Sequence, residues 1–340
     1  MDGAPWRLTM AHPLLSAGVV RAVERAASVH RGRPWTSTGF TALDARAAHP
    51  AGIFEGTPFS VFAKLGAGSD GHAQFTAELR GLDLIRRRSA ARTPVPVGSG
   101  ALVIAGDSLL LTEALAERPA AERSRADYEA IGQALAALHA VRDAQFGLTG
   151  SAESDGNGQN DGNEGSERSA RIEGFFGPFP QDNRPVPGGT WADFYAERRL
   201  APSVRRAATS GQLPAELAAG IDRIIARLPA LAGPEPQPAL LHGDAQQNNF
   251  ISTDDGAVVI DACPYFGNPE LDLALLGYFE PVPAAVFDAY RDVCTVDRDF
   301  GARIELWRLF AYLAVITGPG ESPVGRDFLG RVARAVARYA

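Results

Sequence analysis

Residues 240–250 read LLHGDAQQNNF and residues 256–267 read GAVVIDACPYFG, and together they carry the strongest signal in the chain. In the first stretch His242, Asp244 and Asn249 follow an apolar pair. In the second, Asp261 ends a Val-Val-Ile run. A short apolar run of this kind suits a buried strand, so the carboxylate of Asp261 is expected where that strand emerges from the core. The two stretches predict a group of polar side chains presented by buried strands.

The spacing within the first stretch indicates the chemistry. Asp244 and Asn249 are five positions apart, which is the Asp-x-x-x-x-Asn interval of a kinase catalytic loop. There the Asp accepts the proton of the attacking hydroxyl, while the Asn and a later Asp, here Asp261, are oxygen ligands of Mg²⁺. The interval favours Asn249 over its neighbour Asn248. For either stretch alone, an ordinary turn or a strand-end cap stays open, but their order and separation favour the kinase interpretation.

A single lysine marks the first third of the chain. Of the 33 basic side chains, all but Lys64 are arginine, which suggests a site that needs a compact ammonium. Lys64 ends the run FSVFAK and resembles the strand lysine that contacts nucleotide phosphates in kinases. Glu78 lies between Phe75 and Leu82 on the inward face of a predicted helix, where a carboxylate needs a partner. Lys64 is the expected partner, and a local arginine is the alternative.

The apolar pattern changes character near residue 115. Residues 1–115 predict a small lobe of strands with one helix at 72–88, and residues 116–340 predict a larger, mainly helical lobe. The strands are expected at 52–54, 59–65, 101–106 and 109–115. The last of these takes the place of a hinge, where backbone groups near Glu113 and Leu115 would pair with adenine. Residues 151–169 are rich in Gly, Ser, Asn and acid and predict a disordered insertion. The expected fold class is α+β.

Composition limits the kinds of partner that the protein is expected to bind. The net charge of −7 argues against a nucleic-acid or anionic-membrane surface and favours small molecules or proteins. The first residues lack the features of a secretory signal and no apolar run is long enough to span a bilayer, so we expect a cytoplasmic protein. Cys263 and Cys294 lie in no CxxC pair, which predicts free, buried thiols and argues against a zinc site. The sequence does not predict the oligomeric state.

With these residues in place, the chain resembles the fructosamine kinase (ketosamine-3-kinase) family, within the aminoglycoside and choline kinase group of protein-kinase-like folds. The motifs that carry the resemblance are VFAK with Glu78, FFGPFPQDN, WADFYAERRLAP, LLHGDAQQNN, VVIDACPYFGNPELDLALLGYF and ELWRLFAYL. The resemblance implies a two-lobed fold that uses ATP and Mg²⁺ to phosphorylate the 3-hydroxyl of a ketosamine, carried by a free glycated amine or a glycated protein. It implies Asp244 as the catalytic base, Asn249 and Asp261 as magnesium ligands, and Lys64 as the phosphate-binding lysine.

The substrate positions come from the resemblance alone. Asn183 and Tyr265 match motif positions close to the sugar site. Gln246 stands two residues after Asp244, where many family members carry Trp, and this leaves the sugar or amine preference open. Asp261 is followed by Ala-Cys, whereas the Asp at this position of the family is usually followed by Pro.

Two other functions stay open from the sequence. One is a kinase of the same fold that acts on an aminoglycoside, another amino sugar or a small alcohol. The other is a pseudokinase that binds nucleotide without catalysis, although the complete set of predicted catalytic residues argues against it. No G-x-G-x-x-G precedes Lys64, which counts against a protein kinase but not against a small-molecule kinase.

Overall fold

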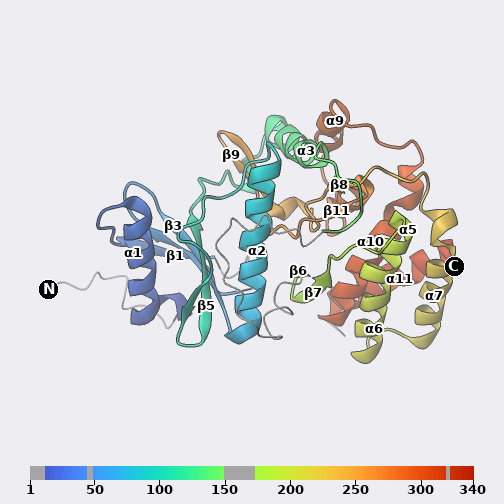
Figure 1. Ribbon diagram of the computed structural model, residues 1–340, viewed down its shortest axis with the longest axis horizontal. Helices are drawn as coiled ribbons and strands as arrows, with labels where there is room; N and C mark the ends of the chain where they lie inside the picture. The colour runs from blue at the N-terminus through green and yellow to red at the C-terminus, as the bar shows by residue number, and fades with distance from the viewer. Residues whose placement is uncertain (1–11, 44–48, 149–172, 319–321) are drawn as a thin grey trace.

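A five-stranded antiparallel sheet forms one end of the molecule and helices form the other (Figure 1). The computed structural model describes residues 12–43, 49–148, 173–318 and 322–340. The sheet has the order β1-β2-β3-β5-β4. Its strands are β1 (Gly39–Ala42), β2 (Ala51–Glu55), β3 (Val61–Gly66), β4 (Leu102–Ile104) and β5 (Asp107–Glu113). β3 lies at the centre, with Lys64 opposite Ala51 on one side and Leu110 on the other.

Two helices accompany the sheet, α1 (Ala17–Arg31) and α2 (Gly68–Arg88). The prediction of one helix in this part of the chain is therefore wrong, although the predicted helix at 72–88 lies within α2. α1 follows the single turn η2 (Pro13–Leu15), is capped by Ser16 and ends at Gly32 in the left-handed conformation. Its buried side chains are Val19, Val20, Val23 and Ala27. Their helical spacing places them on one apolar face against the sheet.

The remainder of the described chain is mainly helical. Its helices are α3 (Arg125–His139), α5 (Trp191–Tyr195), α6 (Ala201–Thr209), α7 (Ala215–Leu231), α8 (Pro269–Leu275), α9 (Ala284–Arg291), α10 (Phe300–Thr317) and α11 (Pro323–Tyr339), with short 3₁₀ turns η4 (Ala120–Glu122) and η6 (Gln247–Asn249). A π-helical turn, η5 (Ala196–Leu200), joins α5 to α6. The α+β class predicted from the sequence is confirmed.

Within the described ranges, three two-stranded ladders connect these helices to the centre of the molecule. They are β6 (Glu173–Phe176) with β7 (Phe179–Asp182), β8 (Ala239–Leu240) with β11 (Phe266–Gly267), and β9 (Phe250–Thr253) with β10 (Gly256–Val259). The ladder of β8 and β11 brings the two motif stretches side by side, because Leu240 pairs with Phe266. The predicted insertion at 151–169 lies outside the described residues.

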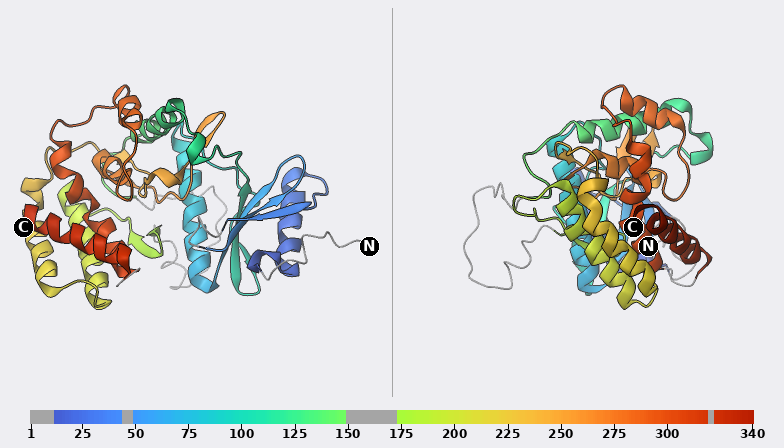
Figure 2. Two further views of the ribbon diagram at one scale, coloured as in Figure 1. Left: turned by 180° about the vertical axis from the view of Figure 1, so that it is seen from behind. Right: turned by 90° about the vertical axis from the view of Figure 1, so that its right-hand side faces the viewer.

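The buried apolar side chains of the described residues form two separate clusters. The smaller one joins α1 to the sheet, and the larger one fills the helical part and includes Leu82 and Ile85 of α2. α2 thus stands between the sheet and the helices, as both sides of the molecule show (Figures 1 and 2), while α6, α7 and α11 lie at the end away from the sheet. We propose that the chain passes from one lobe to the other after Leu115.

Two smaller expectations concern the thiols and the membrane. Cys263 and Cys294 are buried and free, which confirms the prediction made for them. None of the helices in the described ranges is long and apolar enough to cross a membrane.

Candidate active site

The loop after β8 carries the first group of predicted site residues. Leu240 and Leu241 are fully buried and anchor the start of the loop. At Gly243 the backbone has φ +82°, and a Cβ would lie 2.0 Å from the carbonyl oxygen of Cys263. Only glycine fits this close approach, and the His-Gly-Asp sequence therefore turns sharply beside the segment that follows Asp261.

Asp272 of α8 holds the backbone of this turn. Its carboxylate is fully buried and accepts hydrogen bonds from the N–H groups of His242 at 2.6 Å and Gly243 at 3.1 Å. The same carboxylate contacts His139 Nε2 at 3.1 Å, and His139 Nδ1 lies 2.8 Å from the Tyr290 hydroxyl. The N-cap of α8 is Asn268. Asp272 therefore braces the loop rather than capping its helix, and both ring nitrogens of the buried His139 have a polar partner.

Asp244 and Asn249 lie together in the loop. The amide of Asn249 donates to the carbonyl oxygen of Asp244 at 2.8 Å, whereas Asn248 is exposed. Gln246 donates to Asp244 Oδ2 at 3.4 Å. Asp244 Oδ1 is buried and has no hydrogen-bond partner among the described residues. A buried acceptor in this state is an expected place for a ligand donor.

Lys64, Glu78 and Asp261 form the second group. Lys64 Nζ donates to Glu78 Oε1 at 3.0 Å and Oε2 at 3.3 Å, and it makes a short ion pair with Asp261 Oδ1. The predicted pairing of Lys64 with Glu78 is confirmed, and the local-arginine alternative is wrong. Gly81 permits this approach of α2, because a Cβ there would lie 2.7 Å from Pro264. Asp261 itself has φ 52°, a strained value for a residue with a side chain and one often found at functional sites.

Backbone hydrogen bonds on either side of Asp261 join the two groups of site residues. The N–H of Ile260 donates to the carbonyl oxygen of Asn249 at 3.0 Å, and the N–H of Cys263 donates to that of His242 at 2.9 Å. Residues that are far apart in the chain, on β3, α2, the loop after β8 and the loop after β10, therefore converge on one place.

Burial and nearby charges give the carboxyl groups of the site different pKa values. Burial raises the pKa of Asp244 to about 7, and the negative charge of Asp261 adds to the rise. Burial also raises the pKa of Glu78, with Lys64 acting against it. Burial opposes ionisation of Asp261 as well, but the Lys64 ammonium prevails and lowers its pKa. Burial lowers the pKa of His242, which therefore stays neutral, and its Nδ1 accepts from the N–H of Asp244 at 3.2 Å.

The oxygens near Asp261 fit a hard divalent cation. Asn249 donates through its amide nitrogen, so its amide oxygen faces elsewhere, and Asp261 contributes a carboxylate. Carboxylate and amide oxygens are the donor set that Mg²⁺ prefers, with phosphate oxygens and water completing the shell. Within the described ranges, no three His, Cys, Asp or Glu side chains are grouped to hold a metal by themselves.

The remaining predicted residues lie outside this convergence. The N–H of Glu113 donates to the carbonyl oxygen of Val95, and its carboxylate lies 2.9 Å from His30 Nε2. Leu115 follows β5 and accepts from the N–H of Glu117 through its carbonyl oxygen. Asn183 and Tyr265 are 1% and 0% exposed, so the structure buries both side chains.

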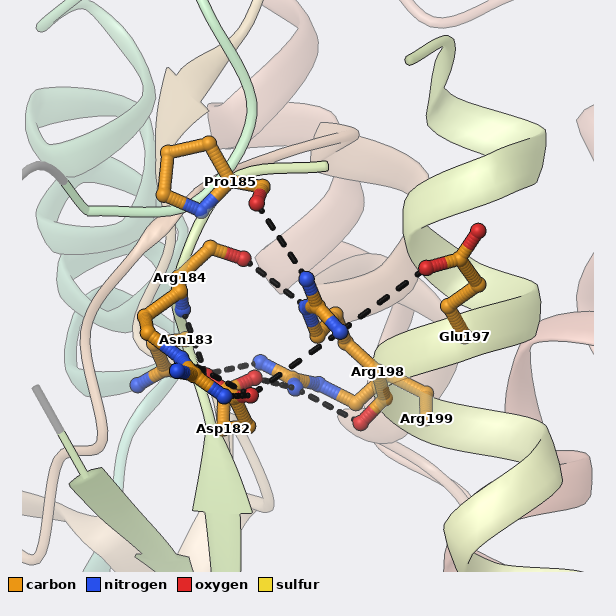
Figure 3. Close-up of polar contacts among 7 residues, drawn as sticks. All are labelled: Asp182, Asn183, Arg184, Pro185, Glu197, Arg198 and Arg199. Atoms are coloured by element: carbon orange, nitrogen blue, oxygen red, sulfur yellow. Dashed lines mark hydrogen bonds and ion pairs between the residues drawn. The ribbon is translucent and has the colours of Figure 1, made fainter. Parts of the chain in front are cut away.

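Sequence reasoning missed the residue that joins Asn183 to Tyr265. Arg199 of η5 bonds to both, as Figure 3 shows for Asn183. A signal was present in WADFYAERRL, because Arg199 falls among apolar positions, as Glu78 does on α2. The argument that a charge on an apolar face needs a partner applies to it equally.

Comparison with known proteins gives this geometry its context. A sequence model of the family described as fructosamine kinase matches residues 19–158 and 170–323. A probable ketoamine kinase of Synechocystis sp. is 31% identical over 247 residues, which cover 70% of this chain and 71% of that protein. A ketosamine-3-kinase of Mus musculus is 28% identical over 74% of this chain and 81% of its own. The crystal structure of a candidate fructosamine-3-kinase from Thermobifida fusca has a TM-score of 0.74 and 30% identity, and covers 94% of this chain and 99% of that one.

The fold and the converging residues define a small-molecule kinase of the protein-kinase-like, two-lobed fold. Because the family model spans most of the chain, the family follows directly. The chain belongs to the fructosamine kinase family.

Proposed function

We propose that the protein transfers the γ-phosphoryl group of ATP to a hydroxyl of a ketosamine, the 3-hydroxyl in the reaction that the family resemblance implies. The observation that carries the proposal is the contact of Lys64 with both Glu78 and Asp261, beside a buried Asp244 whose Oδ1 is free for a ligand within the described part of the chain. The names of the Synechocystis and mouse relatives support the ketosamine as acceptor.

Each residue of the site has a role in this reaction. Asp244 Oδ1 accepts the hydrogen of the acceptor hydroxyl and orients that oxygen toward the phosphorus, while Gln246 holds Oδ2. Lys64, fixed by Glu78, contacts the phosphates of ATP. Phosphoryl transfer demands mainly alignment and charge stabilisation, and few residues suffice for it.

Asn249 and Asp261 would hold the magnesium ion through their side-chain oxygens. When bound, the ion neutralises the charge on the transferring phosphates. Lys64 contacts Asp261 Oδ1 and lowers the pKa of Asp261, which keeps this carboxylate in the ionised form that a metal ligand needs. The backbone near Glu113 and Leu115 is the proposed adenine contact, because it leads from the end of β5 to the proposed boundary between the lobes.

Asn183 and Tyr265 act on the acceptor side as supports rather than as direct contacts, because neither side chain is exposed. Gln246 is the half-buried neighbour of the base and the proposed acceptor contact.

The test is the variant Asp244→Asn assayed by ADP release with a panel of acceptors. The panel contains ketosamines derived from glucose and from ribose, and aminoglycosides. We expect the wild type to turn over ketosamines, and the variant to lose at least about 10³-fold in kcat while it keeps its affinity for ATP. Normal turnover by the variant would refute the base assignment. Turnover of aminoglycosides alone would refute the acceptor, and tight ATP binding without any turnover would indicate a pseudokinase.

A stability measurement separates loss of chemistry from loss of fold. The folded pKa of Asp244 lies above its usual value, so the folded chain binds the proton more tightly than the unfolded chain. Ionising Asp244 therefore destabilises the fold as the pH rises from its usual pKa of 3.8 to its folded pKa of about 7. Asp244→Asn removes this penalty and is expected to unfold at pH 8 at a midpoint no lower than that of the wild type.

A further inference from the structure

Arg199 is a buried guanidinium in the wall next to the catalytic loop. It is 1% exposed and lies in η5, between α5 and α6. Figure 3 shows it reaching from its helix toward the end of β7. Single π-helical turns often occur at functional sites, because the extra residue re-aims a side chain. Here the turn directs Arg199 inward.

The hydrogen bonds of Arg199 go to neutral acceptors. Nε donates to the Tyr265 hydroxyl at 3.3 Å, Nη1 to the carbonyl oxygens of Asp182 at 3.1 Å and Arg198 at 3.0 Å, and Nη2 to Asn183 Oδ1 at 2.5 Å. Its guanidinium lies 4.1 Å from the ring centroid of Tyr265. Among the described residues, no carboxylate forms an ion pair with it. The neighbouring Arg198, in contrast, lies 3.9 Å from Asp182 Oδ2.

A buried cation without an acidic partner is expensive to keep. Removing the charge from water is costly, and the fork of hydrogen bonds and the aromatic ring offset this cost only in part. A well-packed apolar residue of similar volume would often stabilise such a place equally well. The arrangement therefore indicates that the hydrogen bonds donated by the Arg199 guanidinium have a role of their own.

That task is to fix the side chain of Asn183. A guanidinium only donates, so the bond from Nη2 holds the amide oxygen of Asn183 toward Arg199 and turns its nitrogen toward Cys263 Sγ, 3.9 Å away. The carbonyl oxygen of Asn183 accepts from the N–H of Leu148 at 2.7 Å. Arg199 thus locks the chain where β7 ends.

The same fork reaches the catalytic loop through Tyr265. The carbonyl oxygen of Tyr265 accepts from the N–H of Leu241, directly before His242, at 2.9 Å. Tyr265 also stacks on Phe194, with ring centroids 5.5 Å apart. One side chain therefore joins the end of β7, the turn η5 and the loop before β11, and the last of these pairs with the start of the catalytic loop.

We propose that Arg199 is a positioning residue that aligns the acceptor side of the site, acting through Asn183 and Tyr265 and not through contact with the substrates. This inference rests on the proposed function, because the acceptor is taken to be a ketosamine. The positioning role concerns the acceptor and not ATP, whose proposed contacts lie on β3, in the segment after β5 and in the loop after β10.

The test compares Arg199→Lys with Arg198→Lys as the matched control. Both changes keep the charge and remove the fork, but Arg198 donates to the carbonyl oxygens of Arg184 and Pro185 on the outer side of the same turn (Figure 3). The probe is the ketosamine of glucose and Nα-acetyl-lysine, with ADP release as the readout. We expect Arg199→Lys to lower kcat/KM for the ketosamine by about 10- to 100-fold and to leave the KM for ATP at the wild-type value. Arg198→Lys should keep both.

Asn183→Ala provides a second arm that leaves Arg199 in place. It should show the same split between the two substrates, and the double variant should lose no more than the worse single one, because both act through one contact. Equal loss toward ATP and ketosamine, or additive losses, would overturn the proposal and leave Arg199 a structural residue.

Amide hydrogen exchange gives a readout that needs no acceptor. If the wild type turns over no ketosamine, the proposed function fails, and the inference is then decided by the amides of Leu148 and Leu241. Faster exchange of both in Arg199→Lys than in Arg198→Lys supports the positioning role. Equal exchange in the two variants overturns it.

Discussion

Replacing Asp272 by Asn tests how the catalytic loop is held in place. The change keeps the shape of the side chain and removes its charge and one of its two acceptor oxygens. In the native chain, one oxygen accepts from the N–H of His242 and contacts His139, and the other accepts from the N–H of Gly243. Whichever way the new amide turns, its NH₂ group must face a backbone N–H.

The magnitude follows from these contacts. One charge-assisted hydrogen bond is lost, worth about 1.5–3 kcal/mol, and a buried donor is left unsatisfied, which costs about 1–3 kcal/mol and overlaps in part with the first loss. Asp272 is fully buried, so solvent cannot compensate. We expect the free energy of unfolding to fall by about 2–4 kcal/mol. Because Gly243 precedes Asp244, kcat should fall by about 10²-fold as well.

The assay is urea unfolding together with steady-state ADP release. Asp193→Asn is the matched control, because Asp193 likewise accepts from a backbone N–H, that of Thr190 at 2.9 Å, but at an exposed position. The control should cost no more than about 1 kcal/mol and leave kcat unchanged. If the two variants unfold alike, or Asp272→Asn keeps wild-type kcat, the bracing role is wrong.

Three further outcomes are expected. Lys64→Met should lower kcat/KM for ATP by about 10²- to 10³-fold, measured by ADP release, and a smaller change than in Arg88→Met, an exposed arginine of α2, would contradict it. Asn249→Ala should raise the Mg²⁺ concentration for half-maximal activity by about tenfold or more; an unchanged titration would remove Asn249 from the ligand set. The kcat/KM for ATP should fall as the pH drops below about 7, because Asp244 must be ionised to accept a proton; a flat profile from about pH 5.5 to 7 would contradict this.

Four of the five strands of the sheet, the helix at 72–88 and the helical character of the larger lobe could be predicted from the apolar pattern, whereas β1 could not. α1 could not, because its apolar face is made of Val and Ala, and β-branched residues weaken a helical signal. The sequence nevertheless contains residues typical of its boundaries, with Ser16 as the N-cap and Gly32 as the C-cap. The hairpin of β6 and β7 was missed because its strands are short and its turn depends on Gly177 with φ 54°.

The pairing at the centre of the site could be predicted because burial forces it. A carboxylate on the inward face of a helix and a lysine on a central strand each need a partner of opposite charge, and this requirement identifies the pair Lys64 and Glu78 from the sequence alone. The same argument indicates that Arg199 is a buried charge, but it does not predict which residues Arg199 contacts. Arg199 lies five positions after Phe194, well off one face of a helix with 3.6 residues per turn, yet its guanidinium lies 5.1 Å from that ring. The π-helical turn brings them together, and no propensity in the sequence announces such a turn.

One cation explains why two neighbouring aspartates are suited to opposite tasks. Lys64 contacts Asp261 and lowers its pKa, whereas Asp244 has no cation beside it in the described structure and its pKa is raised by burial and by the charge of Asp261 itself. A pair of acids driven apart in this way is the arrangement that acid–base catalysis requires. The acid that stays ionised is suited to hold a metal, and the acid that gains proton affinity is suited to take a proton from an alcohol. If Lys64 contacted Asp244 instead, the roles would reverse, so the placement of this one side chain supports the assignment of both aspartates.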